Sequence, residues 1–308
     1  MRRFKKVTAV AAVAALLFAG AACSKKSDSG DNAADADCVE KGDIKVGMAF
    51  DVGGRGDQSF NDSAAKGMDK AACELGFEVK DAEAQNGEPE SAREERLQQL
   101  VDAGYNPVIA VGFAYSESVG KVAKANPDVN FAIVDDMVAG DNIANLTFAE
   151  EQGSFLVGAA AALKSETGNI GFIGGVDTEL IHKFQAGYEA GAKAVNPDIK
   201  VQSVYLTFKA ATDAKKWAIG VDSDQAKTAD ASVRDSILTS MLKNIDVAVF
   251  DFLQSVEEGT PDTGPRVYDL AVDGVGYSTT GGHVDDIASK LDEYKQQIID
   301  GTITVPTK

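Results

Sequence analysis

The chain has 308 residues, and its 48 acidic against 30 basic side chains give a formal net charge of −18 at pH 7. A surface this acidic repels nucleic acid phosphates, which argues against DNA or RNA as a partner. A chain of this length exceeds a comfortable single hydrophobic core, so two lobes are expected.

Residues 1–22 are predicted to be an export signal, in which four basic residues precede the apolar run 7–22. Cys23 follows directly, which predicts a bacterial lipobox and lipidation of Cys23, although Gly20 stands where a bulky aliphatic residue is usual. The alternative is ordinary signal cleavage nearby. Residues 23–40 would then form the lipidated N-terminus and a flexible acidic linker. Removal of residues 1–22 takes away four basic residues and leaves 26 − 48 = −22 charges.

Two further cysteines, Cys38 and Cys73, remain in the exported chain, and an even remainder in an oxidising compartment predicts a disulfide. Cys38 lies just before the first predicted strand, and Cys73 lies near the end of the first predicted helix. Because the strand runs up and the helix runs back down, both cysteines return to the same end of the unit. The alternative is a pair of buried thiols.

From residue 44 onward, short apolar runs alternate with helical patterns. This alternation predicts βαβ units and a mainly parallel sheet. The expected strands are 44–50, 77–83, 107–113 and 130–136, and the expected helices are 60–75, 90–103 and 116–125. The first strand leads into the glycine-rich stretch 51–67, which contains Arg-Gly-Asp at 55–57. A loop at the carboxyl end of such a strand is a ligand-binding position, so we interpret it as a small-molecule site and not as an adhesion motif.

A second series begins near residue 143. Strands are expected at 143–149, 169–175, 199–208 and 216–224, and helices at 150–164 and 179–195. Only about seven residues separate the last two strands, whereas parallel neighbours need a crossover of a dozen or more. Either these two strands are antiparallel, or a whole unit is missing.

The remaining elements complete two lobes. A strand is expected at 236–243, a helix from Ile245 with Asn244 as a candidate cap, short strands at 266–274 and 275–279, and a terminal helix at 284–300. These elements predict an α/β, two-lobed periplasmic binding-protein (type I) fold, in which each lobe is a mainly parallel sheet flanked by helices. Lobe 1 would take 41–144 plus 238–265, and lobe 2 would take 145–237 plus 266–308.

Three aspartates, Asp51, Asp135 and Asp222, stand at the carboxyl ends of predicted strands, where open α/β sheets place ligands. Signals for catalysis are weak by comparison. The stretch 276–280, GYSTT, is not a nucleophile elbow, and neither His182 nor His283 has metal-ligand spacing. The sequence therefore predicts a binding protein with no catalytic residue, no metal and no cofactor.

Several long blocks resemble one known family. They are DVGGRGDQSFNDSAAKG, FAIVDD, GFIGGVDTELIHKFQAGYEAGAKAVNPDI, WAIGVDSDQ and TSMLK, in this order from about residue 40 to the C-terminus. They resemble the basic membrane protein family of bacterial substrate-binding lipoproteins, which deliver purine nucleosides to ABC importers. The resemblance implies a monomer that binds a purine nucleoside and a transporter permease, held at the outer face of the membrane by its lipid anchor.

The resemblance also implies residue roles. Asp51 and Asn61 would address the base edge, Phe60 would stack on the base, and Asp135 or Asp136, Asp222 and Lys243 would hold the ribose. Each has an alternative. Phe60 fits a core position, and Phe113 would either close the pocket or pack in the core. Asn61 and Asp62 fit a helix cap in competition with Ser59, and Lys243 fits a surface charge. Asp136 and Asp224 are expected to be solvated or loop-bonded neighbours.

In the family, the pattern after TFKAATDA continues through a helix, a strand, a glycine-rich turn and another helix before WAIGVDSDQ. Here some thirty residues of that pattern are missing near 213–216, so we expect a second lobe that lacks one unit and binds purine nucleosides weakly or not at all. The alternative is a natural short variant that has repacked. Two other functions remain open: a binding lipoprotein for a sugar or another small solute, and an exported nucleoside-processing enzyme.

Overall fold

A computed structural model describes residues 38–205 and 216–308. The predicted export signal, the lipidation site Cys23 and most of the region of the expected gap lie outside these residues. Within them, helices and strands occur where the sequence places them, with shifts of one to a few residues at their ends.

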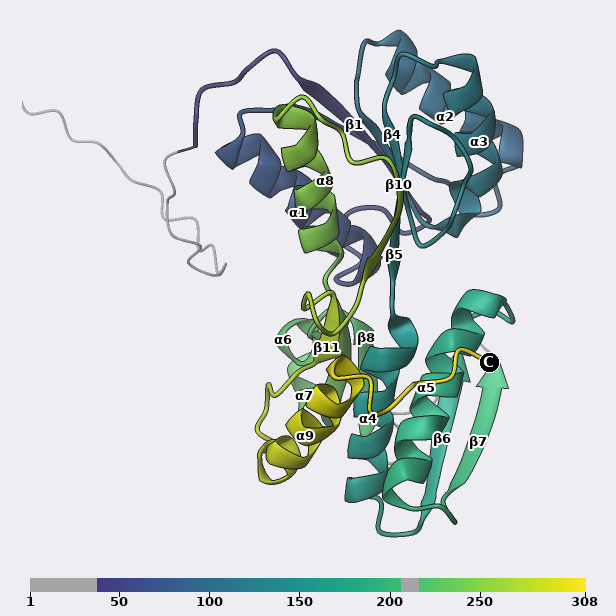
Figure 1. Cartoon of the computed structure of the whole chain (residues 1–308), viewed down its shortest axis with the longest axis vertical. Helices are drawn as coiled ribbons and strands as arrows, with labels where there is room; N and C mark the ends of the chain where they lie inside the picture. The colour runs from purple at the N-terminus through teal and green to yellow at the C-terminus, as the bar shows by residue number, and fades with distance from the viewer. Residues whose placement is uncertain (1–37, 206–215) are drawn as a thin grey trace, which may run out of the picture. The chain divides into compact units, whose positions relative to one another are not determined.

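The first lobe is built on a six-stranded sheet with the order β10-β5-β4-β3-β1-β2, in which all neighbouring strands are parallel. Its strands are β1 Lys45–Phe50, β2 Glu78–Glu83, β3 Val108–Val111, β4 Phe131–Val134, β5 Ile143–Phe148 and β10 Gly264–Tyr268. Helices α1 (Phe60–Glu74) and α8 (Ile245–Glu257) cover one face, and α2 (Glu90–Asp102) and α3 (Ser116–Ala125) cover the other (Figure 1). Every residue of β3 and β4 is buried, as expected for central strands of a parallel sheet covered on both faces.

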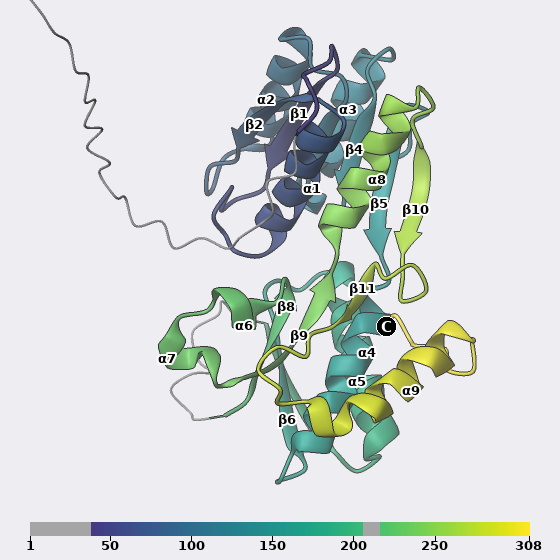
Figure 2. The same cartoon turned by 90° about the vertical axis from the view of Figure 1, so that its left-hand side faces the viewer.

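The second lobe contains two separate small sheets. Strands β6 (Asn169–Gly174) and β7 (Lys200–Tyr205) form a parallel pair. Strands β8 (Ala218–Asp222), β9 (Ile237–Lys243) and β11 (Val275–Tyr277) form the other sheet, in which β9 is central. Helices α4 (Glu150–Lys164), α5 (Glu179–Val195) and α9 (Ala288–Ile299) pack around these sheets, and the short α6 (Gln225–Thr228) and α7 (Ala231–Arg234) follow β8 (Figure 2).

The α4–α5 pair is packed backbone to backbone. A Cβ atom on Gly158, Gly187 or Gly191 would overlap a backbone carbonyl of the facing helix, at Tyr188, Glu151 and Phe155 respectively. Only glycine allows helices to approach this closely, so these residues fix the spacing of the pair. The pair spans both small sheets, because α5 packs against β6 while α4 packs against β9 and β11.

Strands β6 and β7 are covered on one face only. The side chains of Ile170 and Phe172 pack against the core, whereas Ile173 and Val204 on the opposite face are 38% and 46% exposed. In the part of the chain that the structure describes, β7 pairs only with β6, and β8 pairs only with β9. The alternative of an antiparallel pairing between β7 and β8 is therefore wrong.

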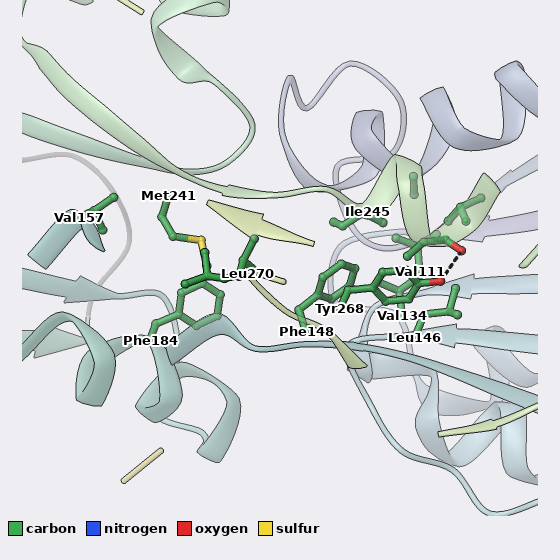
Figure 3. Packing of buried hydrophobic residues seen from close by; sticks show 14 of the residues in the cluster. Val111, Val134, Leu146, Phe148, Val157, Phe184, Met241, Ile245, Tyr268 and Leu270 are labelled. Carbon is green, nitrogen blue, oxygen red and sulfur yellow. Dashed lines mark hydrogen bonds between the residues drawn. The ribbon is translucent and has the colours of Figure 1, made fainter. Parts of the chain in front are cut away.

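The chain crosses between the lobes three times. Sheet pairing places the crossings after β5, after β9 and after β10, near residues 149, 244 and 269, a few residues later than the sequence predicts. Strand β9 belongs to lobe 2 because it pairs with β8 and β11. One hydrophobic core runs through the crossings, where Phe148 and Tyr268 stack with their ring centroids 5.5 Å apart (Figure 3).

Cys38 and Cys73 form a disulfide, as the sequence predicts. The bond ties the segment before β1 to the end of α1, where the amide of Val39 also donates a hydrogen bond to the carbonyl of Cys73 at 2.9 Å. Within the described ranges, none of the helices is both long enough and apolar enough to cross a membrane.

Candidate functional site

A buried lysine stands at the point where the chain leaves lobe 2. Lys243 is the last residue of β9, and its side chain is only 2% exposed. Its ammonium lies 2.6 Å from Asp135 Oδ2, 3.7 Å from Asp222 Oδ1 and 3.8 Å from Glu150 Oε1. We call these four residues the Lys243 cluster. The alternative of a surface lysine is wrong.

The ammonium of Lys243 is also surrounded by aromatic rings. It lies 5.1 Å from the ring centroid of Phe60, 5.4 Å from that of Phe148 and 5.5 Å from that of Phe184. These distances are within the range of cation–π attraction. Phe60 is half-buried and lies at this site, at the edge of the core. Its ring is therefore available as one wall of the site.

Charges in the Lys243 cluster are unequal, because three carboxylates face one ammonium. Burial alone would lower the pKa of Lys243, but the charges of Asp135, Asp222 and Glu150 raise it, so the lysine is held protonated. Burial raises the pKa of Asp222 and of Glu150, and the charge of Lys243 only partly offsets this. The cluster therefore has a surplus of acceptor oxygens.

Asp135 and Asp222 hold equivalent positions in the two lobes. Asp135 directly follows β4, Asp222 is the last residue of β8, and each has a left-handed backbone, with φ of 68° and 64°. This conformation is rare for residues other than glycine and costs energy, and it gathers at functional sites. Oδ1 of each aspartate is buried and has no hydrogen-bond donor among the described residues. One oxygen from each lobe thus lacks a hydrogen-bond donor, and that of Asp222 lies 3.7 Å from the Lys243 ammonium.

Neighbouring aspartates have different partners. Asp136 accepts hydrogen bonds from the Ser116 hydroxyl and from the amide of Met137, so Asp135 is the residue that faces the cluster. Asp224 accepts from the hydroxyl of Thr280 at 2.5 Å and lies 3.2 Å from Lys227 Nζ. Both neighbours are bonded to loops, as expected from the sequence.

The glycine-rich loop before α1 is organised by Asp57. Its carboxylate accepts hydrogen bonds from the amides of Ser59, Asn61 and Asp62, at 2.8 to 3.1 Å. The Asp57 side chain therefore caps the N-terminus of α1, whereas the Ser59 side chain makes no capping hydrogen bond. Arg55 pairs with Asp69 and Asp81. Because both charged residues of the Arg-Gly-Asp triplet are engaged within the fold, the structure favours a structural role for the triplet.

Asp51 and Asn61 lie together at the end of β1. The amide of Asp51 donates to Asn61 Oδ1 at 3.0 Å, and Asn61 Nδ2 donates to Asp57 at 3.1 Å. Asn61 is only 2% exposed and lies inside α1, where its side chain holds the loop and does not cap the helix. Burial raises the pKa of the half-buried Asp51, whose Oδ2 lies against Gly112. Gly112 has a φ of 104° and no Cβ, which allows this approach.

The two lobes also touch directly beside the site. The Ser59 hydroxyl donates to the carbonyl of Val221 at 3.2 Å, and the Ser223 hydroxyl donates to the carbonyl of Ser59 at 3.1 Å. These reciprocal bonds join the start of α1 in lobe 1 to the end of β8 in lobe 2. They hold Phe60, which follows Ser59, near Asp222, which lies between Val221 and Ser223.

Sequence reasoning missed Glu150, Lys183, Phe148 and Phe184, all of which meet at the cluster. Glu150 is 1% exposed, and Lys183 Nζ bridges Glu150 Oε2 at 2.5 Å and the carbonyl of Phe148 at 2.8 Å. An available signal was the glutamate that begins the long apolar helix 150–164. Phe113, by contrast, is 40% exposed and is not a core residue. Among the described residues, no group of three acidic, histidine or cysteine side chains could hold a metal ion.

The chain has two lobes, a mainly parallel sheet, and acidic, lysine and aromatic side chains gathered at the crossings between the lobes. This combination is typical of ABC transporter substrate-binding proteins. A solute-binding protein of an ABC transporter from Aeropyrum pernix shares this fold with a TM-score of 0.73 and 27% sequence identity, over 86% of this chain and 94% of that one. A solute-binding protein from Conexibacter woesei is similar at a TM-score of 0.67.

The chain belongs to the family described as ABC transporter substrate-binding protein PnrA-like, whose model matches residues 44–208. A CD4+ T-cell-stimulating antigen of Listeria innocua is 30% identical, over 99% of each chain. A protein of Lactococcus lactis named ABC transporter nucleoside-binding protein BmpA is 29% identical, also over 99% of each chain. The resemblance to the basic membrane protein family is therefore confirmed.

The alignment with the Listeria relative is longer than this chain. It extends over 356 positions, whereas the chain has 308 residues, so at least 356 − 308 = 48 positions have no counterpart here. The family match also stops at residue 208, close to the short link between the expected strands 199–208 and 216–224.

Proposed function

We propose that the chain is the extracytoplasmic substrate-binding component of an ABC importer and that its ligand is a purine nucleoside. The observation that carries this proposal is the pair of buried acceptor oxygens on Asp135 and Asp222, which flank Lys243 beside the Phe60 ring. A ribose offers vicinal hydroxyl donors, and a purine offers a flat face for stacking. Hydrogen bonds from the hydroxyls to ionised carboxylates are of the stronger kind.

In this proposal each residue has a chemical task. Asp135 and Asp222 accept from the two ribose hydroxyls, and Lys243 donates to a ribose oxygen. Phe60 stacks on the base, and Asp51 addresses the base edge while Asn61 holds the loop. Stacking of a base on one aromatic ring is worth about 1–3 kcal/mol. No step of bond breaking is assigned to any of these groups.

The second lobe is proposed to lack one βα unit near 213–216, within and beside residues that the structure does not describe. Three observations support this proposal. The lobe has two small sheets in place of one continuous sheet, the exposed face of β6 and β7 carries Ile173 and Val204, and the alignment with the Listeria relative leaves at least 48 positions unmatched. The missing unit would have supplied a second aromatic wall, so the base half of the site is incomplete while the ribose half is retained.

Export and anchoring are part of the same proposal. Cleavage before Cys23 and lipidation of that residue would tether the protein outside the membrane, next to the permease that receives the ligand. A multi-chain lipid anchor holds because each buried methylene contributes about 0.8 kcal/mol. Mass spectrometry of the N-terminal peptide from membrane fractions would test this, since an unmodified Cys23 contradicts it.

The ligand class is tested by ligand-observed NMR, which detects weak binding. We expect inosine, guanosine and adenosine to give saturation-transfer signals with the full chain, and arabinose and glucose to give none. The sugar-binding alternative predicts the reverse. Release of free base from inosine on prolonged incubation would instead support an enzyme. Asp135→Asn should abolish the nucleoside signals, because it removes an acceptor without a change in size.

A further inference from the structure

The two oxygens of Glu150 face two different lysines. Oε2 lies 2.5 Å from Lys183 Nζ, and Oε1 lies 3.8 Å from Lys243 Nζ. Glu150 is the first residue of α4, immediately after the crossing from β5, and it is 1% exposed. A carboxylate this deeply buried is costly unless it is paired, and here Lys183 and Lys243 supply the opposite charges.

Lys183 links Glu150 to the crossing itself. Besides Glu150, its ammonium binds the carbonyl of Phe148, the last residue of β5, at 2.8 Å. Lys183 belongs to the first turns of α5, and the next residue, Phe184, places its ring 5.5 Å from the Lys243 ammonium. The start of α4, the start of α5 and the end of β5 therefore meet at Lys243.

Asp135 and Glu150 approach the Lys243 ammonium from different lobes. Asp135 lies in lobe 1 at 2.6 Å, whereas Glu150 and Asp222 lie in lobe 2 at 3.8 and 3.7 Å. Without the lobe 2 carboxylates, the ammonium would be attracted toward Asp135 alone. Its position thus depends on a balance of charges from both lobes.

We infer that Glu150 is a positioning residue for ligand capture, which holds the Lys243 ammonium between the lobes while Lys183 fixes Glu150 to the crossing. This inference rests on the proposed function for its ligand, but the position of the ammonium can be measured without one. The charged groups around Glu150 are Lys243 on β9, Lys183 on α5, Glu151 on α4, Asp135 after β4 and Asp222 at the end of β8.

The first test observes the lysine ammonium directly. In the full chain labelled with ¹⁵N-lysine, a buried and charge-paired ammonium exchanges its protons slowly with water, and Lys243→Arg identifies the Lys243 resonance. Glu150→Gln keeps the size of the side chain and removes its charge. We expect proton exchange at the Lys243 ammonium to become about tenfold faster. A tenfold change corresponds to a loss of about 1.4 kcal/mol from the interaction that protects the ammonium.

Glu151→Gln is the matched control. Glu151 is in the same helical turn and lies 3.6 Å from Lys183, but no ion pair joins it to Lys243 in the described structure. Its replacement should change the exchange rate by less than about twofold, as for a weakly coupled pair. Equal effects of Glu150→Gln and Glu151→Gln, or no effect of Glu150→Gln, would overturn the inference.

Lys183→Gln provides a second, opposite readout if Glu150→Gln does not fold. Without Lys183, the whole charge of Glu150 is available to Lys243, so we expect slower exchange at the Lys243 ammonium. Faster exchange would contradict the inference. Thermal unfolding of each variant checks that it is folded.

Titration with inosine then tests whether the position of the Lys243 ammonium affects ligand binding. By ligand-observed NMR we expect Glu150→Gln to weaken binding about tenfold and Glu151→Gln to leave it within about twofold. If the unmodified chain binds no nucleoside, the proposed function fails, while the exchange rates still decide the role of Glu150. Unchanged inosine affinity in Glu150→Gln would reject its role in capture.

Discussion

Asp222 and Asp224 are separated by one residue, yet they face different surroundings. Each has one buried oxygen without a hydrogen-bond donor, but Asp222 lies 3.7 Å from the Lys243 ammonium, whereas Asp224 accepts a hydrogen bond from Thr280 and pairs with Lys227. Asp222→Ala should therefore weaken nucleoside binding by roughly 1–3 kcal/mol, the cost of an unsatisfied buried donor. Asp224→Ala should change it little. Competition experiments by ligand-observed NMR measure both, and equal losses would show that the roles are wrongly assigned.

The same two residues should give opposite pH dependences of stability. Burial raises the pKa of Asp222 above its ordinary 3.8, so the native state takes up a proton more readily than the unfolded chain. Ionisation of Asp222 therefore lowers the free energy of unfolding as the pH rises from 3.8 to the raised pKa of Asp222. For Asp222→Asn, the free energy of unfolding relative to the unmodified chain should increase as the pH rises above 3.8.

The pKa of Asp224 is shifted in the opposite direction. Burial would raise its pKa, but hydrogen bonds from Thr280 and Ser278 and the contact with Lys227 lower it below 3.8. Its ionised form stabilises the native state above 3.8, and this contribution is lost as the pH falls through the lowered value. Asp224→Asn should be less stable than the unmodified chain at neutral pH, with a smaller difference in acid. Urea unfolding at a series of pH values tests both, and slopes of the same sign would contradict the assignment.

Helices α4 and α5 pack backbone to backbone in lobe 2. A methyl group on Gly187 would overlap the carbonyl oxygen of Glu151, so Gly187→Ala must push the helices apart. We expect a loss of stability of at least about 1–3 kcal/mol, as for other overpacked cores. Gly171→Ala is the control, because the nearest atom to its Cβ is 3.6 Å away. Chemical denaturation that shows equal losses would argue against a close helix pair.

Strand β7 allows a direct test of the missing unit. Val204 lies on the exposed face of the strand, and Val201 lies on the face that packs against the core. In a complete parallel sheet both positions would be covered by helices. We therefore expect Val204→Thr to change the free energy of unfolding by less than about 0.5 kcal/mol, as surface substitutions do. Val201→Thr should cost clearly more, and similar costs would indicate that the exposed face is covered.

At the scale of the whole molecule, the sequence predicts the strand ends well and the contacts at the crossings poorly. Asp135 and Asp222 could be predicted because each stands at the carboxyl end of a strand in its own sheet, whereas Lys243 was implied only by the family resemblance. Glu150 and Lys183 could not, because their meeting depends on how α4 and α5 pack after the crossing. The choice of cap has a similar cause: Asn61, Asp62 and Ser59 were all candidates, and tertiary geometry gives the capping hydrogen bonds to Asp57 instead.

The expected lobe boundaries lie a few residues before the crossings for a related reason. Strands β5 and β9 run as regular strands up to the crossings, and their apolar patterns do not change where one lobe ends. Only the pairing of β9 with β8 and β11 shows which lobe it belongs to. Pairing over long distances in the sequence is not encoded in the local pattern of apolar residues.

The central claim is that a nucleoside site survives here with an intact ribose half and an incomplete base half. Calorimetric titration of the full chain with adenosine, guanosine and inosine tests it most directly. Loss of one aromatic wall, worth about 1–3 kcal/mol, predicts dissociation constants weaker than micromolar by about one to two orders of magnitude. The affinities should differ little among the three bases. Micromolar or tighter binding, together with a cooperative thermal transition, would contradict the claim and show that the site is complete without the missing unit.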